Sequence, residues 1–170
     1  MGRNKVLLFC LTAAAGLAPF GCGSNAAAPT DDADFVSCAD ETRATPYAPG
    51  MSVTSQNGAF VLKLLNNVFV VNGKALSEAP AKGQDTWTIE VDDTTTGAPV
   101  DGVTMTVNPR MPDQRHGTTP VGVTAAGAGT YTLDPVNLFM AGYWEVTIGL
   151  GAATDSTAAD SAVFRICVPG

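Results

Sequence analysis

In this 170-residue sequence, the side chains that best suit binding chemistry are those of two methionines and one histidine. Met111 and His116 lie in the stretch Asn108–Thr118, which is rich in proline and arginine, and Met140 lies further along the chain. Thioether sulfur and imidazole nitrogen are soft ligands that suit Cu(I). If the fold brings the three residues together, they predict a copper site.

A second interpretation gives the same residues no ligand. Methionine commonly fills irregular gaps in a hydrophobic core, and a histidine in a Pro/Gly-rich loop commonly faces solvent or bonds to a backbone carbonyl. Arg110 and Arg115 flank the stretch and would repel a cation. The sequence leaves open whether these residues bind metal or only build the fold.

No catalytic pattern occurs in the sequence. The single histidine excludes a centre with several histidine ligands, and the GxSxG, HExxH and P-loop patterns are missing. The acidic pairs Asp31–Asp32 and Asp92–Asp93 fall in a predicted spacer or turn, where nothing indicates the shaped pocket that acid–base catalysis needs. We therefore predict that the protein is not an enzyme.

Residues 1–21 have the organisation of a bacterial signal peptide. Arg3 and Lys5 precede an apolar run from Val6 to Phe20, which is shorter than the roughly 20 residues of a transmembrane helix. Gly21-Cys22 closes the run and resembles the lipobox of bacterial lipoproteins, which predicts lipidation of Cys22. The alternative is ordinary secretion with cleavage after Ala13–Ala15.

Residues 22–45 are predicted to be the lipidated cysteine and a flexible tether, because Gly23 to Asp34 has no hydrophobic periodicity. All sixteen acidic residues lie after Cys22, so the mature part is more acidic than the net charge of −7 of the whole chain and repels nucleic acid. We expect an exported protein held by its lipid at the periplasmic face of a membrane. Gly23 after Cys22 favours the outer membrane.

Cys38 and Cys167 remain after Cys10 leaves with the signal peptide and Cys22 takes the lipid. An isolated pair in an oxidising compartment usually forms a disulfide. The alternative, a thiol pair that holds a metal, has no CxxC spacing to support it. We predict a Cys38–Cys167 disulfide.

Residues 46–170 are predicted to form an all-β domain, an immunoglobulin-like antiparallel β-sandwich of about seven strands. Apolar and polar residues alternate, or apolar residues run together, in short stretches. The expected strands are Phe60–Leu65, Trp87–Val91, Val103–Val107, Val121–Thr124, Tyr131–Leu133, Trp144–Ile148 and Phe164–Val168.

Turn residues separate these strands, and one region has two interpretations. Turns are predicted at Asp101-Gly102, Gly127–Gly129, Asp134-Pro135 and Gly149–Gly151. Val68–Val71 is predicted to be an extra strand or part of a long first hairpin, and Lys74–Glu78 to make one helical turn.

The order of motifs resembles the YtkA-like/FixH-like family of exported bacterial domains. The resemblance rests on three features: the Trp87–Val91 strand leading through Gly97–Val100 into a second strand, Met111-Pro112 followed by His116–Thr118, and Met140-x-Gly142 ahead of the aromatic strand Tyr143–Val146. It implies an immunoglobulin-like β-sandwich and, for some members, respiratory-oxidase assembly and copper handling.

Two functions from different classes follow. The first is a membrane-anchored, non-enzymatic binding module of the cell envelope that contacts copper or a respiratory-oxidase partner. The second is a structural or protein-interaction lipoprotein domain without a metal ligand, whose partner is another envelope protein.

The lipid anchor can be tested with Cys22→Ser. This variant should move the protein from the membrane fraction to the soluble periplasmic fraction, because the lipid is its only predicted attachment. Cell fractionation and mass spectrometry of the mature N-terminus measure this. A wild-type protein that is already soluble and begins at Gly16 would disprove the lipoprotein prediction.

Overall fold

The computed structural model describes residues 37–151 and 160–170. The predicted signal peptide, the lipidation site Cys22 and the spacer up to residue 36 lie outside the described residues. In the described part, no helix has the length and apolar character needed to cross a membrane.

Strands make up almost all regular structure in these ranges. After the 3-10 helix η1 (Cys38–Asp40), the strands are β1 (Met51–Thr54), β2 (Phe60–Val71), β3 (Lys74–Ser77), β4 (Gly83–Asp93), β5 (Thr104–Met111), β6 (His116–Gly117), β7 (Gly122–Gly127), β8 (Thr130–Leu138), β9 (Gly142–Gly151) and β10 (Asp160–Val168).

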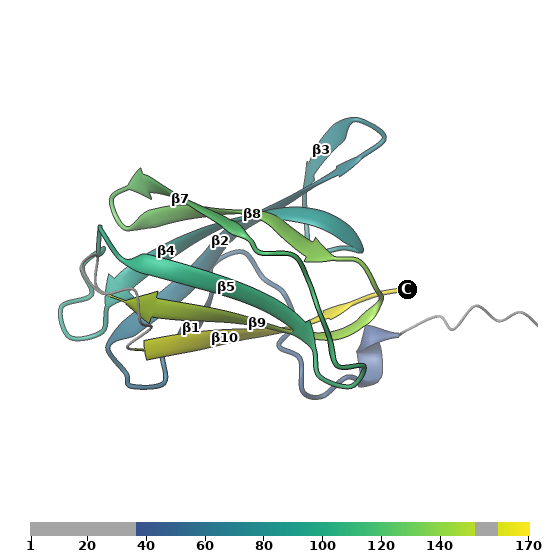
Figure 1. Cartoon of the computed structure of the whole chain (residues 1–170), viewed down its shortest axis with the longest axis horizontal. Helices are drawn as coiled ribbons and strands as arrows, with labels where there is room; N and C mark the ends of the chain where they lie inside the picture. Colours follow the sequence, from purple (N-terminus) through teal and green to yellow (C-terminus); the bar gives the residue numbers. More distant parts are fainter. Residues whose placement is uncertain (1–36, 152–159) are drawn as a thin grey trace, which may run out of the picture. The chain divides into compact units, whose positions relative to one another are not determined.

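The strands form two antiparallel sheets that pack face to face (Figure 1). One has the order β1-β2-β4-β8-β7, with β3 also paired to β2, and the other has the order β10-β9-β5-β6. The orders β2-β4-β8-β7 and β10-β9-β5 match the A-B-E-D and G-F-C sheets of an immunoglobulin domain. The predicted immunoglobulin-like sandwich is confirmed.

Alternation along the strands places one apolar row of each sheet inside the sandwich. In β4, Trp87, Ile89 and Val91 are fully buried, while Thr88 and Glu90 between them are half-buried on the other face. Trp87 meets Phe164 of β10 edge-on, with ring centroids 5.8 Å apart, so the contact joins the two sheets. Full burial of one such side chain contributes roughly 1.5–3 kcal/mol, and the paired inner faces therefore dominate the stability of the domain.

The long first hairpin is confirmed, and the helical turn at Lys74–Glu78 is wrong. β3 pairs with the second half of β2, from Val68 opposite Ser77 to Val71 opposite Lys74. Asn72 and Gly73 both have positive φ, as a two-residue type I′ turn requires. The Asn-Gly turn and the valines of β2 favour a hairpin strongly enough to overcome the helical tendency of Lys74–Glu78.

Two predicted turns lie inside strands. Asp134-Pro135 belongs to β8, at the point where the register with β4 shifts between Asp85 and Trp87. Proline cannot donate a ladder hydrogen bond, and a bulge is where a strand tolerates it. Gly149–Gly151 belongs to β9, whose neighbours β5 and β10 both pair with it there. Backbone pairing on both sides outweighs the turn tendency of these glycines.

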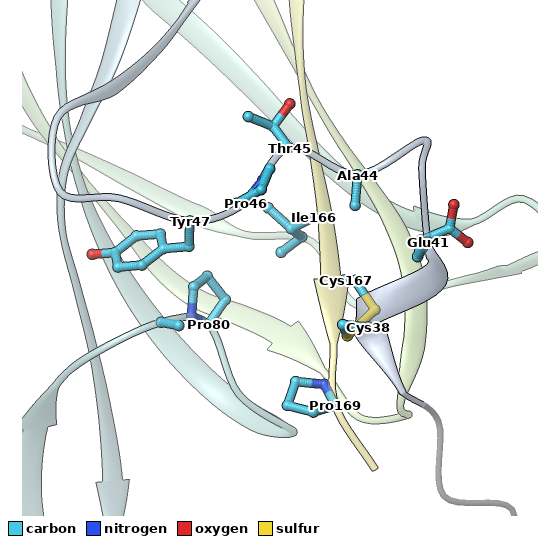
Figure 2. Close-up of a pocket in the computed structure, with 11 residues that line it drawn as sticks. Cys38, Glu41, Ala44, Thr45, Pro46, Tyr47, Pro80, Ile166, Cys167 and Pro169 are labelled. Atoms are coloured by element: carbon cyan, nitrogen blue, oxygen red, sulfur yellow. A yellow bond between two sulfur atoms is a disulfide. The ribbon is translucent and has the colours of Figure 1, made fainter.

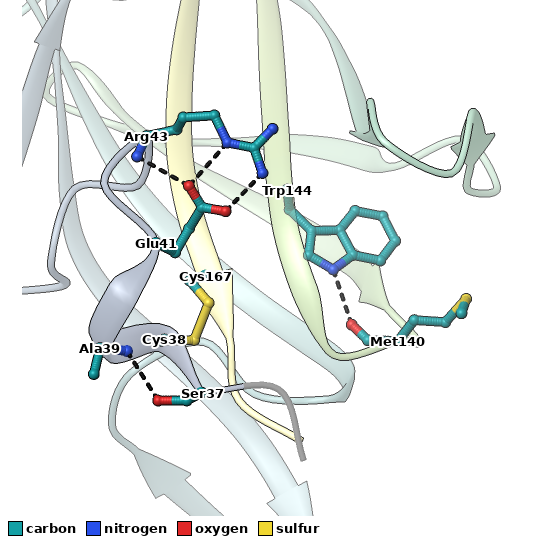
Figure 3. The surroundings of a disulfide bond; sticks show 8 residues. All are labelled: Ser37, Cys38, Ala39, Glu41, Arg43, Met140, Trp144 and Cys167. Carbon is teal, nitrogen blue, oxygen red and sulfur yellow. Dashed lines mark hydrogen bonds and ion pairs between the residues drawn. A yellow bond between two sulfur atoms is a disulfide. The ribbon is translucent and has the colours of Figure 1, made fainter. Parts of the chain in front are cut away.

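The predicted Cys38–Cys167 disulfide is present, with Cα atoms 5.6 Å apart (Figure 3). Cys167 lies between the buried Ile166 and Val168 of β10, so its side chain points to the outer face. Thr45 adds a backbone hydrogen bond to Arg165 of the same strand, 2.9 Å long. The described residues before position 46 are therefore attached to the sandwich.

Replacing both cysteines, Cys38→Ser with Cys167→Ser, should lower the free energy of unfolding by about 2–5 kcal/mol, because the disulfide closes a long loop in the unfolded chain. Urea unfolding of the mature protein measures the change. Wild-type protein unfolded with reductant is the control and should match the double variant. A double variant as stable as oxidised wild type would show that the bond does not stabilise the domain.

Candidate functional site

One end of the sandwich holds the residues predicted to bind copper. Met111 is the last residue of β5 and His116 the first of β6, and the ladder places them directly opposite each other. Residues in such a position have Cβ atoms about 4.5–5.5 Å apart. The tight β5–β6 connection thus makes a thioether and an imidazole neighbours.

Met140 lies in the loop from β8 to β9, and aromatic contacts connect this loop to His116. The His116 and Phe139 rings have centroids 6.4 Å apart, and Phe139 meets Trp144 at 5.5 Å. The indole nitrogen of Trp144 donates to the carbonyl oxygen of Met140 over 2.9 Å (Figure 3). The β8–β9 loop is therefore fixed by side chains at the same end as His116.

Gly142 brings Met111 to the same loop. A Cβ atom added at Gly142, which has a φ of +131°, would lie 2.8 Å from the terminal methyl carbon of Met111. The methionine side chain consequently packs against the backbone at the start of β9. The structure thus brings Met111, His116 and the loop of Met140 to one end of the sandwich.

The three side chains differ in exposure. Met111 is 2% exposed, Met140 is half-buried against the core, and His116 is exposed. Over residues 37–151 and 160–170, no three His, Cys, Asp or Glu side chains form a group able to hold a metal ion.

Arg43 attaches the N-terminal segment to the β5–β6 loop. Its guanidinium donates to both carboxylate oxygens of Asp113, at 2.8 and 2.7 Å, and also to Glu41. It lies 4.1 Å from the centroid of the Tyr143 ring. The hydrogen bonds from Arg43 hold the pKa values of the Glu41 and Asp113 carboxyls below their ordinary range. We call this set of contacts the Arg43 cluster.

A pocket of about 310 Å³ lies beside the disulfide (Figure 2). Its lining is mainly apolar and comes from the N-terminal segment, the β3–β4 connection and the end of β10: Cys38, Glu41, Ala44, Thr45, Pro46, Tyr47, Ala79, Pro80, Ile166, Cys167 and Pro169. Glu41 supplies the one carboxylate of this lining, and Arg43 already occupies it. The pocket therefore lacks the pair of free carboxylates that acid–base catalysis would use.

Comparison with known proteins identifies the domain. Residues 70–149 match the family model described as YtkA-like. The chain carries a YtkA-like domain. The matched range runs from within β2 to within β9, so it includes both loops of the Met111, His116 and Met140 end. No curated protein and no solved structure shows a significant match to the chain. The YtkA-like family is not a known enzyme family.

Sequence reasoning missed the contacts that hold this end of the YtkA-like domain together. Arg43 and Asp113 are 70 residues apart, and nothing in their local patterns connects them. For the hydrogen bond of Trp144, the sequence did contain an indication. In immunoglobulin-like sandwiches a tyrosine near the start of strand F bonds to backbone a few residues upstream. Trp144 of β9 makes the corresponding bond with its indole.

Arg43→Gln should return the pKa of the Asp113 carboxyl to its ordinary range, because the guanidinium is the main cause of the lowered value. A lowered pKa contributes stability above the ordinary value and loses it as pH falls through the lowered one. The variant should therefore lose less stability than wild type on acidification. Carboxyl NMR titration measures the change, with Arg110→Gln as the charge-matched control. An unchanged Asp113 titration would contradict the role of Arg43.

Proposed function

We propose that the protein is an exported, lipid-anchored, non-enzymatic binding module of the cell envelope, and that it binds Cu(I) at the end carrying Met111, His116 and Met140. The observation that carries the proposal is the ladder register, which sets Met111 directly opposite His116. Their closeness follows from the β5–β6 connection and needs no rearrangement of the fold.

The ligand set is chemically suited to Cu(I). Met111 and Met140 each offer a thioether sulfur and His116 a neutral imidazole nitrogen, and soft ligands of this kind select the cuprous ion. The hydrogen bond from Trp144 and the ring of Phe139 hold the loop of Met140 in position. Ligands held by such surrounding contacts need little ordering when the ion binds.

The arginines near the site are less of an obstacle than their positions in the sequence suggest. Arg110 is exposed whereas its neighbour Met111 is buried, and adjacent residues of a strand point to opposite faces. The charge of Arg110 therefore lies on the outer face of the second sheet. Arg43, which also lies near this end, is paired with two carboxylates. Arg115, directly before His116, is exposed, so water screens its charge.

Export is supported by the sequence and by the disulfide. The predicted signal peptide and Cys22 form a lipoprotein leader, and a structural disulfide is typical of an oxidising compartment such as the periplasm. A lipid at Cys22 would keep the domain near a membrane surface.

A second candidate function is a protein-interaction domain without metal. It is favoured by the burial of Met111, which also fills the core, and by Phe139, which is 44% exposed beside His116. An exposed aromatic ring is a common anchor for a protein partner. In this function, the same end of the sandwich would contact an envelope protein directly.

Titration of Cu(I) against a competing chelator distinguishes the two functions. His116→Ala and Met140→Leu should each weaken Cu(I) binding by at least about tenfold, equal to about 1.4 kcal/mol, because each removes one ligand. Met105→Leu is the matched control, since Met105 packs against the core on the same strand as Met111. Equal, weak binding by wild type and all variants would reject the copper site and favour the interaction domain.

A further inference from the structure

Two polar side chains are fully buried between the strands at the start of β4. Asn67 of β2 and Asp85 of β4 both have 0% exposure. The Asn67 amide nitrogen donates to the carbonyl oxygen of Glu78 over 3.0 Å, and the backbone N–H of Ala81 donates to one Asp85 oxygen over 3.3 Å. Both side chains thus hold the backbone of residues 78–82, the crossover from β3 to β4.

One oxygen of each side chain lacks a hydrogen-bond donor. These atoms are Asn67 Oδ1 and Asp85 Oδ2, both buried. A buried polar atom without a partner destabilises the folded state, and here two acceptors are unsatisfied in neighbouring residues. A single proton on Asp85 Oδ2 would satisfy both, because the resulting hydroxyl can donate to Asn67 Oδ1.

We propose that Asp85 and Asn67 form a proton-dependent pair, in which protonated Asp85 donates to Asn67 and the pair fixes the 78–82 crossover. When Asp85 loses its proton, the buried carboxylate has no cation beside it and the crossover becomes free to open. Ala79 and Pro80 of this crossover line the pocket beside the disulfide (Figure 2). The proton on Asp85 therefore controls one wall of that pocket.

The surroundings of Asp85 favour the neutral acid. Burial raises its pKa to about 6, against the opposing effects of the hydrogen bonds from Asn67 and Ala81, and no ionised side chain contributes. Its ladder partners are apolar, Phe69 on β2 and Val136 on β8. The charged residues on the elements packed around it are Lys63, Lys74, Glu78, Lys82, Glu90, Asp92, Asp93 and Asp134. Further along β2 and β4, Lys63 pairs with both Glu90 and Asp92. Asp93 accepts hydrogen bonds from the backbone N–H groups of Thr95 and Thr96, and the other four residues are exposed.

The sign of the pH effect follows from the raised pKa. A carboxyl that is harder to ionise in the folded state stabilises it at low pH, and this contribution is lost as pH rises through about 6. Between about pH 5 and about pH 7.5, the unfolding equilibrium constant should rise by about tenfold through Asp85 alone. The 78–82 crossover, which Asp85 holds directly, should open first.

Carboxyl NMR of the mature wild-type protein tests the pair without any substitution. One aspartate should titrate with a midpoint near 6, and its signal should be missing in Asp85→Asn and kept in Asp134→Asn, a control at an exposed position of β8. If Asp85 titrates in the ordinary range of aspartate, its carboxylate is ionised in the folded state and the proposal is overturned.

Hydrogen exchange tests the consequence for the crossover. After correction for intrinsic rates, the Ala81 amide should exchange faster at about pH 7.5 than at about pH 5 in wild type and in Asp134→Asn. In Asp85→Asn this pH dependence should disappear, because an amide at position 85 can donate to Asn67 Oδ1 at either pH. The same pH dependence in all three proteins would overturn the control of the crossover by Asp85.

Discussion

The contact between the inner faces of the two sheets is the constraint on which the other features depend. Trp87 and Phe164 meet edge-on across the sandwich, and the rows of buried residues in β4, β9 and β10 surround them. Because a shift of one residue would turn a whole row towards solvent, this contact fixes the register of the central strands. It also fixes which loops emerge at each end.

At one end, the chain gathers several features that are far apart in the sequence. The features are the disulfide, the Arg43 cluster, the pocket and the Met111–His116 pair. Their residues come from the N-terminal segment, the β5–β6 and β8–β9 connections and the end of β10. The disulfide, the Arg43 cluster and the β5–β6 pairing each attach a loop or segment to the sandwich at a point where strands end. Loops held on a rigid scaffold commonly carry binding function, which is why the proposed function lies here.

Asn67 and Asp85 are fully buried, whereas the other buried polar residues, Ser55, Asp92 and Asp160, keep a small exposed fraction. Replacing them by apolar residues would remove two unsatisfied oxygens, but it would also leave the Ala81 N–H and the Glu78 carbonyl without their partners. The β3–β4 crossover has no ladder of its own to satisfy these groups. The two buried polar side chains therefore supply hydrogen bonds to the backbone of the crossover, as strand pairing does in the rest of the sheet.

The sequence alone determined the sandwich, the seven strands expected in it and the Cys38–Cys167 disulfide. These depend on alternation of apolar residues and on cysteine count, which are local or compositional properties. It also placed Met111 and His116 in one stretch, because they are close in the chain. The YtkA-like resemblance, carried by the order of these motifs, was confirmed over residues 70–149.

Only the tertiary structure decided the rest. Pro135 and Gly149 are turn-forming residues, yet neighbouring strands incorporate them into β8 and β9. The pairing of Arg43 with Asp113 joins residues that no local pattern connects. The burial of Asp85 could not be predicted from the sequence around it, since an aspartate beside strand residues is ordinarily exposed. Local patterns report which face of a strand is apolar, whereas long-range contacts depend on which strands the core places side by side.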